Sequence, residues 1–173
     1  MPVHVLINLT AEDRPGLVET LSDRVTHHGG NWIDSSMARL GGEFAGIVRV
    51  SLPDAAISAF EQDLKNLVAE GITALVRRTD TSAAPKGRSA RLDLTGADHP
   101  GIVHQISSAL AEQGVSFDEL HTQVVPGSMS GAPVFVAKGR LVLPDDVSID
   151  QIRDRLEAIA QDIMVDVSLN PVG

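Results

Sequence analysis

Two short stretches of the chain carry residue types that could hold a small ligand. They read Asp13-Arg14-Pro15-Gly16 and Asp98-His99-Pro100-Gly101, and each stands between an alternating apolar run and a helical pattern. Proline suits the first turn of a helix, and glycine lets another group approach the backbone. The free N–H groups at such a helix start make an anion site that suits an amino-acid carboxylate. We therefore predict that at least one of the two stretches binds a ligand.

The same stretches also have a purely structural interpretation, in which each is a well-capped turn and its aspartate accepts from free N–H groups of the helix. Asn31 and Ser116 are a second pair of candidates, because each opens a predicted strand shortly after a glycine. Their amide or hydroxyl could hold a ligand's ammonium or carboxylate group, and turn chemistry explains them equally well. Trp32 and Phe117 follow at matching positions, where packing is favoured over ligand stacking.

No set of residues in the sequence is typical of catalysis or metal binding. Cysteine is absent, which excludes disulfides, thiolate ligands and cysteine nucleophiles. His27 and His28 are sequential and point different ways on a helix, and His99 and His104 do not share a helical face. The sequence contains no G-x-S-x-G stretch and no phosphate-loop pattern. We predict a protein that is not an enzyme and needs no metal or cofactor.

The charge balance limits the partners that the protein can have. The 173 residues include 14 lysines and arginines and 23 aspartates and glutamates, so the net charge is −9. Phosphate backbones are bound by clustered basic residues, so direct nucleic-acid binding is not expected. No apolar run approaches the ~20 residues of a membrane span, and the first residues lack the basic start and apolar block of a secretion signal. These features predict a soluble, cytoplasmic protein that does not associate with membranes.

The chain repeats itself. Residues 9–18 read LTAEDRPGLV, and residues 94–103 read LTGADHPGIV, 85 positions further on. A later match joins residues 52–54 with residues 143–145 at an offset of 91, so the second copy has gained residues in between. We predict a first domain at 1–79, a small polar linker at 80–87, and a second domain at 88–173 with a longer loop between its second and third strands.

Each copy reads as a β-α-β-β-α-β unit. In the first copy, residues 3–10 alternate as a strand, and residues 17–25 carry apolar side chains at helical spacing. Two β-rich runs at 31–40 and 44–52 are joined by a tight glycine turn, and a second helix and a last strand follow. We predict an α+β fold of two ferredoxin-like units, each with a four-stranded antiparallel sheet and two helices on one face.

The helices of such a unit leave one face of the sheet uncovered. Polar residues alternate along the strands, so part of this face can meet water, whereas Leu6 and Val48 fall out of phase or face away from the helices. We therefore expect the units to pair, edge to edge or face to face, within one chain or across two. A homo-oligomer, in the simplest case a homodimer, is the corresponding expectation for the whole protein.

On these residues the sequence resembles the ACT-domain family, which comprises small regulatory βαββαβ units that bind amino acids. The resemblance covers nearly the whole chain as two copies, and it depends on the two helix openings and on the run from Asn31 to Ser35. A run in the second copy is similar to the second unit of the glycine cleavage system transcriptional repressor group, which is also a tandem of two such domains. That run comprises Glu119-Leu120-His121-Thr122, Pro126, Met129-Ser130-Gly131 and Pro133-Val134-Phe135.

This resemblance implies a cytoplasmic regulator that senses an amino acid, with glycine as the candidate, and restrains a DNA-binding activator by contacting it. The ligand positions that it carries over are Asp13 to Leu17, Asp98 to Ile102, Asn31 and Ser116. In the second copy a histidine replaces Arg14 and a serine replaces Asn31, which implies either two sites of different affinity or one site that stays empty.

Two other functions stay open from the sequence. The chain could be a detached regulatory subunit of an amino-acid metabolic enzyme, or a ligand-free interaction module whose helix openings are plain turns. The loop at 126–133 fits a surface turn, and it also fits a segment that reaches a ligand site or another protein. The net charge of −9 and the lack of a basic helix favour action through a protein partner over contact with DNA.

Overall fold

The computed structural model describes residues 1–79 and 86–173. The chain divides into two compact units, Met1–Ser82 and Ala83–Gly173, and each is described by itself. The expected linker at 80–87 lies outside the described residues except for Lys86 and Gly87.

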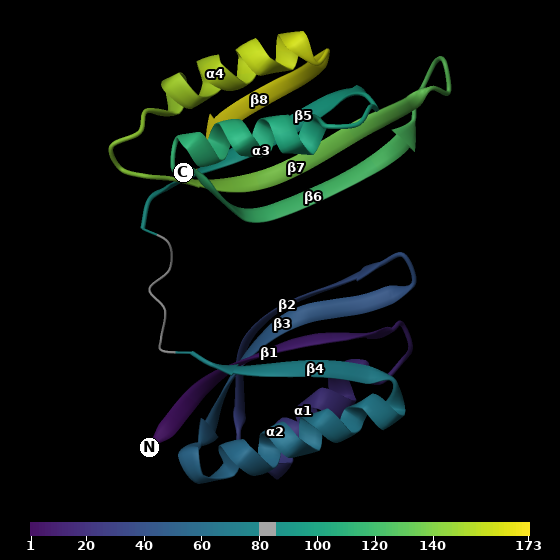
Figure 1. The fold of residues 1–173 in the computed structure, drawn as a ribbon, viewed down its shortest axis with the longest axis vertical. Helices are drawn as coiled ribbons and strands as arrows, with labels where there is room; N and C mark the ends of the chain where they lie inside the picture. The colour runs from purple at the N-terminus through teal and green to yellow at the C-terminus, as the bar shows by residue number, and fades with distance from the viewer. Residues whose placement is uncertain (80–85) are drawn as a thin grey trace. The chain divides into compact units, whose positions relative to one another are not determined.

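The first unit is a four-stranded antiparallel sheet with two helices against one face (Figure 1). Its strands are β1 (Pro2–Glu12), β2 (Asn31–Leu40), β3 (Glu43–Pro53) and β4 (Ile72–Arg78), in the spatial order β2-β3-β1-β4. Its helices are α1 (Leu17–His27) and α2 (Ile57–Asn66), and short 3-10 turns flank α2 at Asp54–Ala56 and Leu67–Glu70.

The second unit repeats this arrangement. Its strands are β5 (Arg88–Ala97), β6 (Ser116–Pro126), β7 (Pro133–Leu143) and β8 (Val165–Pro171), in the order β6-β7-β5-β8. Helices α3 (Ile102–Glu112) and α4 (Ile149–Asp162) cover one face of the sheet (Figure 1). The predicted fold class, two ferredoxin-like α+β units, is therefore confirmed.

Alternation along the strands decides which face of each sheet the helices cover. In β1, Val5, Ile7 and Leu9 are buried beneath the helices, and the side chains of Leu21 from α1 and Phe60 from α2 belong to the same core. Trp32 and Phe117 lie partly buried against the two cores, so the predicted packing role of both aromatic residues is confirmed.

Val48 also belongs to the first core, so the expectation that it falls out of the alternation is wrong. It is fully buried and stands opposite Ile7 in the β1–β3 register. Val50 and Leu52 continue the same face, which shows that β3 stays in phase. Ile47 is the residue that points the other way, and it is half exposed. We call the sheet face opposite the helices the open face.

The two units differ in the hairpin between their second and third strands. In the first unit Gly41 and Gly42 make a tight turn, and both have positive φ. In the second unit the strands are joined by residues 127–132, where the Gly127 amide donates to the Ala132 carbonyl over 2.8 Å.

Candidate functional site

The first helix opening leaves its backbone amides accessible. Gly16 is the residue before α1, has a φ of 91°, and accepts a hydrogen bond from the Thr20 amide over 2.9 Å. No side chain caps the helix, so the first amides of α1, including those of Leu17 and Val18, have no partner of that kind. A Cβ added at Gly16 would meet no atom within 4 Å, so a ligand has room beside the backbone.

A surface pocket of about 310 Å³ lies at this opening. Asp13, Arg14, Gly16 and Leu17 line it together with three residues that the sequence analysis did not single out, Val18, Glu19 and Phe44. Val18 and Glu19 could have been inferred from their place in the first turn of the helix. Phe44 has no signal in the sequence, because it comes from the start of β3 and reaches the opening only through the fold.

Asp13 does not cap the helix, contrary to the structural interpretation of the stretch. Its carboxylate instead pairs with Arg39 at the end of β2, with 2.9 Å between Arg39 Nε and Asp13 Oδ2. Its backbone amide donates to the Gly42 carbonyl over 2.9 Å, which extends the β1–β3 pairing by one residue. The helix amides are thus left to other partners.

The second helix opening has the same backbone geometry. Gly101 precedes α3 with a φ of 95°, accepts from the Gln105 amide over 3.0 Å, and is followed by a helix without a side-chain cap. The Asp98 amide donates to the Pro133 carbonyl over 3.0 Å, in the same way that Asp13 donates to Gly42. Asp98 therefore does not cap its helix either.

Arg14 and His99 make the same contact in the two units although their side chains differ. The Arg14 guanidinium donates to the backbone carbonyl of Glu70, directly before Gly71 and β4. Nε2 of His99 lies 2.8 Å from the carbonyl oxygen of Ile163, which stands at the corresponding place before β8. Each side chain therefore ties its helix opening to the segment that enters the last strand.

The surroundings of His99 favour its protonated form. Nδ1 lies 3.0 Å from the Pro100 carbonyl, so both ring nitrogens face carbonyl oxygens. Carbonyl oxygens only accept, and both nitrogens can donate only in the imidazolium. The hydrogen bond to Ile163 raises the pKa of His99 most, the bond to Pro100 and the charge of Asp98 raise it further, and desolvation opposes them.

The remaining residues of the two openings contribute mainly backbone. Leu17 and Ile102 are almost fully buried in the helix–sheet cores, so only their amides can face a ligand. Pro15 and Pro100 are exposed and precede the glycines.

Asn31 lies at the opposite end of its unit from the first helix opening. It pairs with Ser51 of β3, which in turn pairs with His4 near the start of β1. From His4 to Asp13, β1 advances roughly 30 Å at about 3.3 Å per residue. Within the first unit, Asn31 and the helix opening therefore cannot touch one small ligand together.

Ser116 is placed in the same way in the second unit. It pairs with Val142, which pairs with Ser89 near the start of β5, whereas Asp98 follows the end of β5. Both Asn31 and Ser116 are exposed.

Residues 1–79 and 86–173 contain no group of three histidine, cysteine, aspartate or glutamate side chains that could hold a metal ion. Over the same ranges, every helix is too short or too polar to span a membrane.

The chain shows similarity to known proteins over almost its whole length. The ACT domain family model matches residues 3–74. The glycine cleavage system transcriptional repressor of Escherichia coli (strain K12) is 24% identical over 172 residues, which cover 98% of this chain and 90% of the repressor.

Solved structures show the same two-unit fold. A crystal structure of an unknown protein from Galdieria sulphuraria aligns over 100% of both chains with a TM-score of 0.84 and 28% identity. A second crystal structure, provisionally described as a glycine cleavage system transcriptional repressor, aligns over 99% of this chain and 98% of the other with a TM-score of 0.76 and 21% identity. Residues 3–74 therefore match the ACT domain family, and the chain as a whole, a tandem of two ferredoxin-like units, is similar to the glycine cleavage system transcriptional repressor.

Proposed function

We propose that the protein is an amino-acid-responsive regulator that acts on a DNA-binding transcription regulator by protein contact in the cytoplasm. The observation that carries this proposal is the open, uncapped start of α1 with a pocket beside it, repeated in backbone geometry at the start of α3. The name of the E. coli relative supports the transcriptional role. A net charge of −9 supports a protein partner over DNA.

The chemistry of the first pocket suits a zwitterion. The amides at the start of α1 and the positive end of the helix dipole attract a carboxylate. Glu19 supplies negative charge for an ammonium group in the same pocket. The carboxylate of Asp13 adds to this charge, although it also pairs with Arg39. Val18 and Phe44 add an apolar wall that limits the size of the ligand's side chain. Glycine is the first amino acid to test, because it has no side chain.

Thermal unfolding of the full chain in the presence of each of the twenty amino acids tests this proposal. A ligand at ~100 times its Kd adds about 2.7 kcal/mol to the free energy of unfolding, which a melting curve detects. We expect glycine or another small amino acid to raise the melting temperature. Flat curves for all twenty amino acids would contradict the sensing role.

Glycine substitutions show whether the helix openings hold the ligand. Asparagine tolerates a left-handed backbone, and its side chain would occupy the amides at the start of the helix. We expect Gly16→Asn with Gly101→Asn to abolish the ligand effect while the protein stays folded. Gly41→Asn is the matched control, because Gly41 also has a positive φ and open space around it but lies in the β2–β3 turn.

A defined pull-down tests the mode of action. The purified chain should bind the DNA-binding regulator of the host's glycine cleavage genes in an amino-acid-dependent way, and it should not shift the operator DNA alone. Capture of an amino-acid metabolic enzyme in place of the regulator would support a detached regulatory subunit.

We also expect a homo-oligomer, because Ile47 and Leu75 expose apolar surface on the open face of the first sheet.

A further inference from the structure

The open faces of the two sheets differ in chemistry at matching positions. In the first sheet, one row across the strands consists of Asn8, Ile47 and Leu75. The corresponding row of the second sheet consists of Asp93, Lys138 and Ser168. The neighbouring row has Leu6 in the first sheet and Arg91 in the second. The repeat has thus kept the fold and replaced two apolar side chains, Ile47 and Leu6, with the cations Lys138 and Arg91, whereas both rows that contain Leu6 or Arg91 carry an arginine on the neighbouring β3 or β7 strand.

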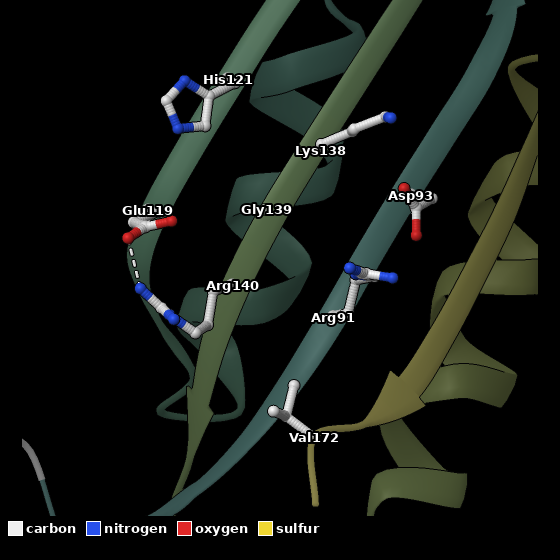
Figure 2. A pocket seen from close by; sticks show the side chains of 8 residues that line it. All are labelled: Arg91, Asp93, Glu119, His121, Lys138, Gly139, Arg140 and Val172. Atoms are coloured by element: carbon white, nitrogen blue, oxygen red, sulfur yellow. Dashed lines mark hydrogen bonds and ion pairs between the residues drawn. The ribbon is translucent and has the colours of Figure 1, made fainter. Parts of the chain in front are cut away.

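A hollow of about 330 Å³ lies on the open face of the second sheet. Its polar lining comes from three adjacent strands, with the side chains all on the side away from the helices (Figure 2). The lining residues that matter here are Glu119 and His121 of β6, Lys138 and Arg140 of β7, and Arg91 and Asp93 of β5.

One cation in the hollow is already neutralised. Arg140 pairs with Asp118, with 2.8 Å between Nε and Oδ2, and also with Glu119. Figure 2 shows the Arg140 guanidinium turned toward Glu119, away from β5. The carboxylates of Asp118 and Glu119 therefore neutralise the charge of Arg140.

Arg91 and Lys138 have no such partner in the part of the chain that the structure describes. Arg91 stands directly opposite Arg140 in the β5–β7 register, and Lys138 stands directly opposite Asp93 without forming an ion pair with it. Asp118 and Glu119 already neutralise Arg140, so the uncompensated charge of this opposed pair is that of Arg91. Arg91 and Lys138 lie diagonally across β5 and β7, so a negatively charged group between them would pair with both cations.

We propose that this hollow binds a small anion through a carboxylate or phosphate group held between Arg91 and Lys138. The volume of the hollow falls in the range of small-molecule sites, and arginine and lysine donate charge-assisted hydrogen bonds to both anionic groups. His121 lies beside Lys138 and adds a ring nitrogen to the lining. Asp93 adds an acceptor, so a ligand that carries a hydroxyl or ammonium donor next to its anionic group fits best. This site shares no residue with the helix openings.

Nitrogen-15 NMR titration of the full chain tests the proposal with inorganic phosphate and with succinate, against sodium chloride at equal ionic strength. We expect saturable shifts centred on the amides around Gly139 that chloride does not reproduce. Saturation by phosphate alone identifies a phosphate site, saturation by succinate alone identifies a carboxylate site, and saturation by both identifies a general oxyanion site. Shifts that match those of chloride for both anions would overturn the proposal.

The first sheet supplies the residues for the test variant. Arg91→Leu with Lys138→Ile gives the second sheet the side chains that the first sheet has at the same positions, so the fold should tolerate them. We expect these substitutions to weaken binding roughly tenfold or more, as loss of charged hydrogen bonds does. Arg77→Leu is the matched control, because Arg77 is an exposed arginine next to Leu6 on the other sheet.

The substitution Asp93→Asn should change the affinity for the anion in the opposite direction. It removes a negative charge from the hollow and leaves Arg91 and Lys138 in place, so we expect it to tighten anion binding. A damaged fold would weaken binding, and therefore tighter binding separates a direct charge effect from a structural one. Unchanged affinity in both Asp93→Asn and the Arg91→Leu/Lys138→Ile variant would also overturn the proposal.

Discussion

At the residue scale, Arg14 and His99 have the same structural role in their two units. Each of them follows the aspartate of its helix opening. Arg14 and His99 donate to the carbonyl that precedes the last strand. The sequence difference between these two residues implied sites of different affinity, and that difference in affinity stays a prediction. The structure adds that both side chains hold their openings against the rest of the unit.

Because His99 is held by two carbonyl groups, its contribution to stability depends on pH. Its folded-state pKa is raised above the ordinary value of 6.5. The stabilisation is therefore fully present below pH 6.5 and is lost as the pH rises through the folded pKa. We expect His99→Gln to lower the free energy of unfolding more at pH 5 than at pH 9, as urea unfolding at both values would measure. NMR titration of the His99 ring would contradict this account if it gave a pKa at or below 6.5.

At the element scale, the junction between the second helical segment and the last strand takes a left-handed residue in both units. Gly71 fills it in the first unit with a φ of 77°, and Met164 fills it in the second with a φ of 53°. Met164 is the only non-glycine residue with positive φ in the described parts of the chain, and its side chain is exposed. A side chain at such a position is strained, whereas glycine adopts the conformation without a steric penalty.

We therefore expect Met164→Gly to stabilise the second unit. The removal of left-handed strain exceeds the added flexibility of the unfolded chain, so the net gain should be roughly 0.5–1 kcal/mol in a urea unfolding experiment. Met129→Gly is the control, because Met129 is also fully exposed but has no positive φ. A loss of stability in Met164→Gly equal to that of the control would show that the junction carries no strain.

At the scale of the whole molecule, each unit has a hydrophobic core of its own. The buried residues form two separate clusters, one in each unit. Phe60 is fully buried in the first, and Leu156 is almost fully buried in the second. We therefore expect each unit to have its own free energy of unfolding, so that a substitution in one core destabilises that unit alone.

Phe60→Ala should lower the stability of the first unit by about 3–5 kcal/mol, the usual cost of an aromatic-to-alanine change in a core. Hydrogen exchange followed by mass spectrometry on the full chain should then show lost protection in β1–β4, while β5–β8 stay protected. Leu156→Ala should give the reverse pattern. Simultaneous loss of protection in both units in either variant would mean that the units unfold together.

Much of the architecture could be predicted from the sequence because its signals are local. The repeat, the β-α-β-β-α-β order and the glycine turns follow from alternation, helical spacing and backbone preference. The two helix openings were found in the same way, since proline and glycine at a strand-to-helix junction act on their own segment. The burial of Val48 does not follow from its own segment, because the phase of β3 depends on its register with β1.

The composition of the candidate sites was decided by contacts between distant segments. Asp13 is held by Arg39, Phe44 reaches the first pocket from another strand, and Asn31 lies at the far end of the sheet. The hollow on the second sheet likewise needs the register that places Arg91 opposite Arg140. By itself, the sequence determined the repeated fold and the two helix openings, because strand, turn and helix preferences act over a few residues. Only the tertiary structure decided which side chains share a site, because register and packing join residues that the chain keeps far apart.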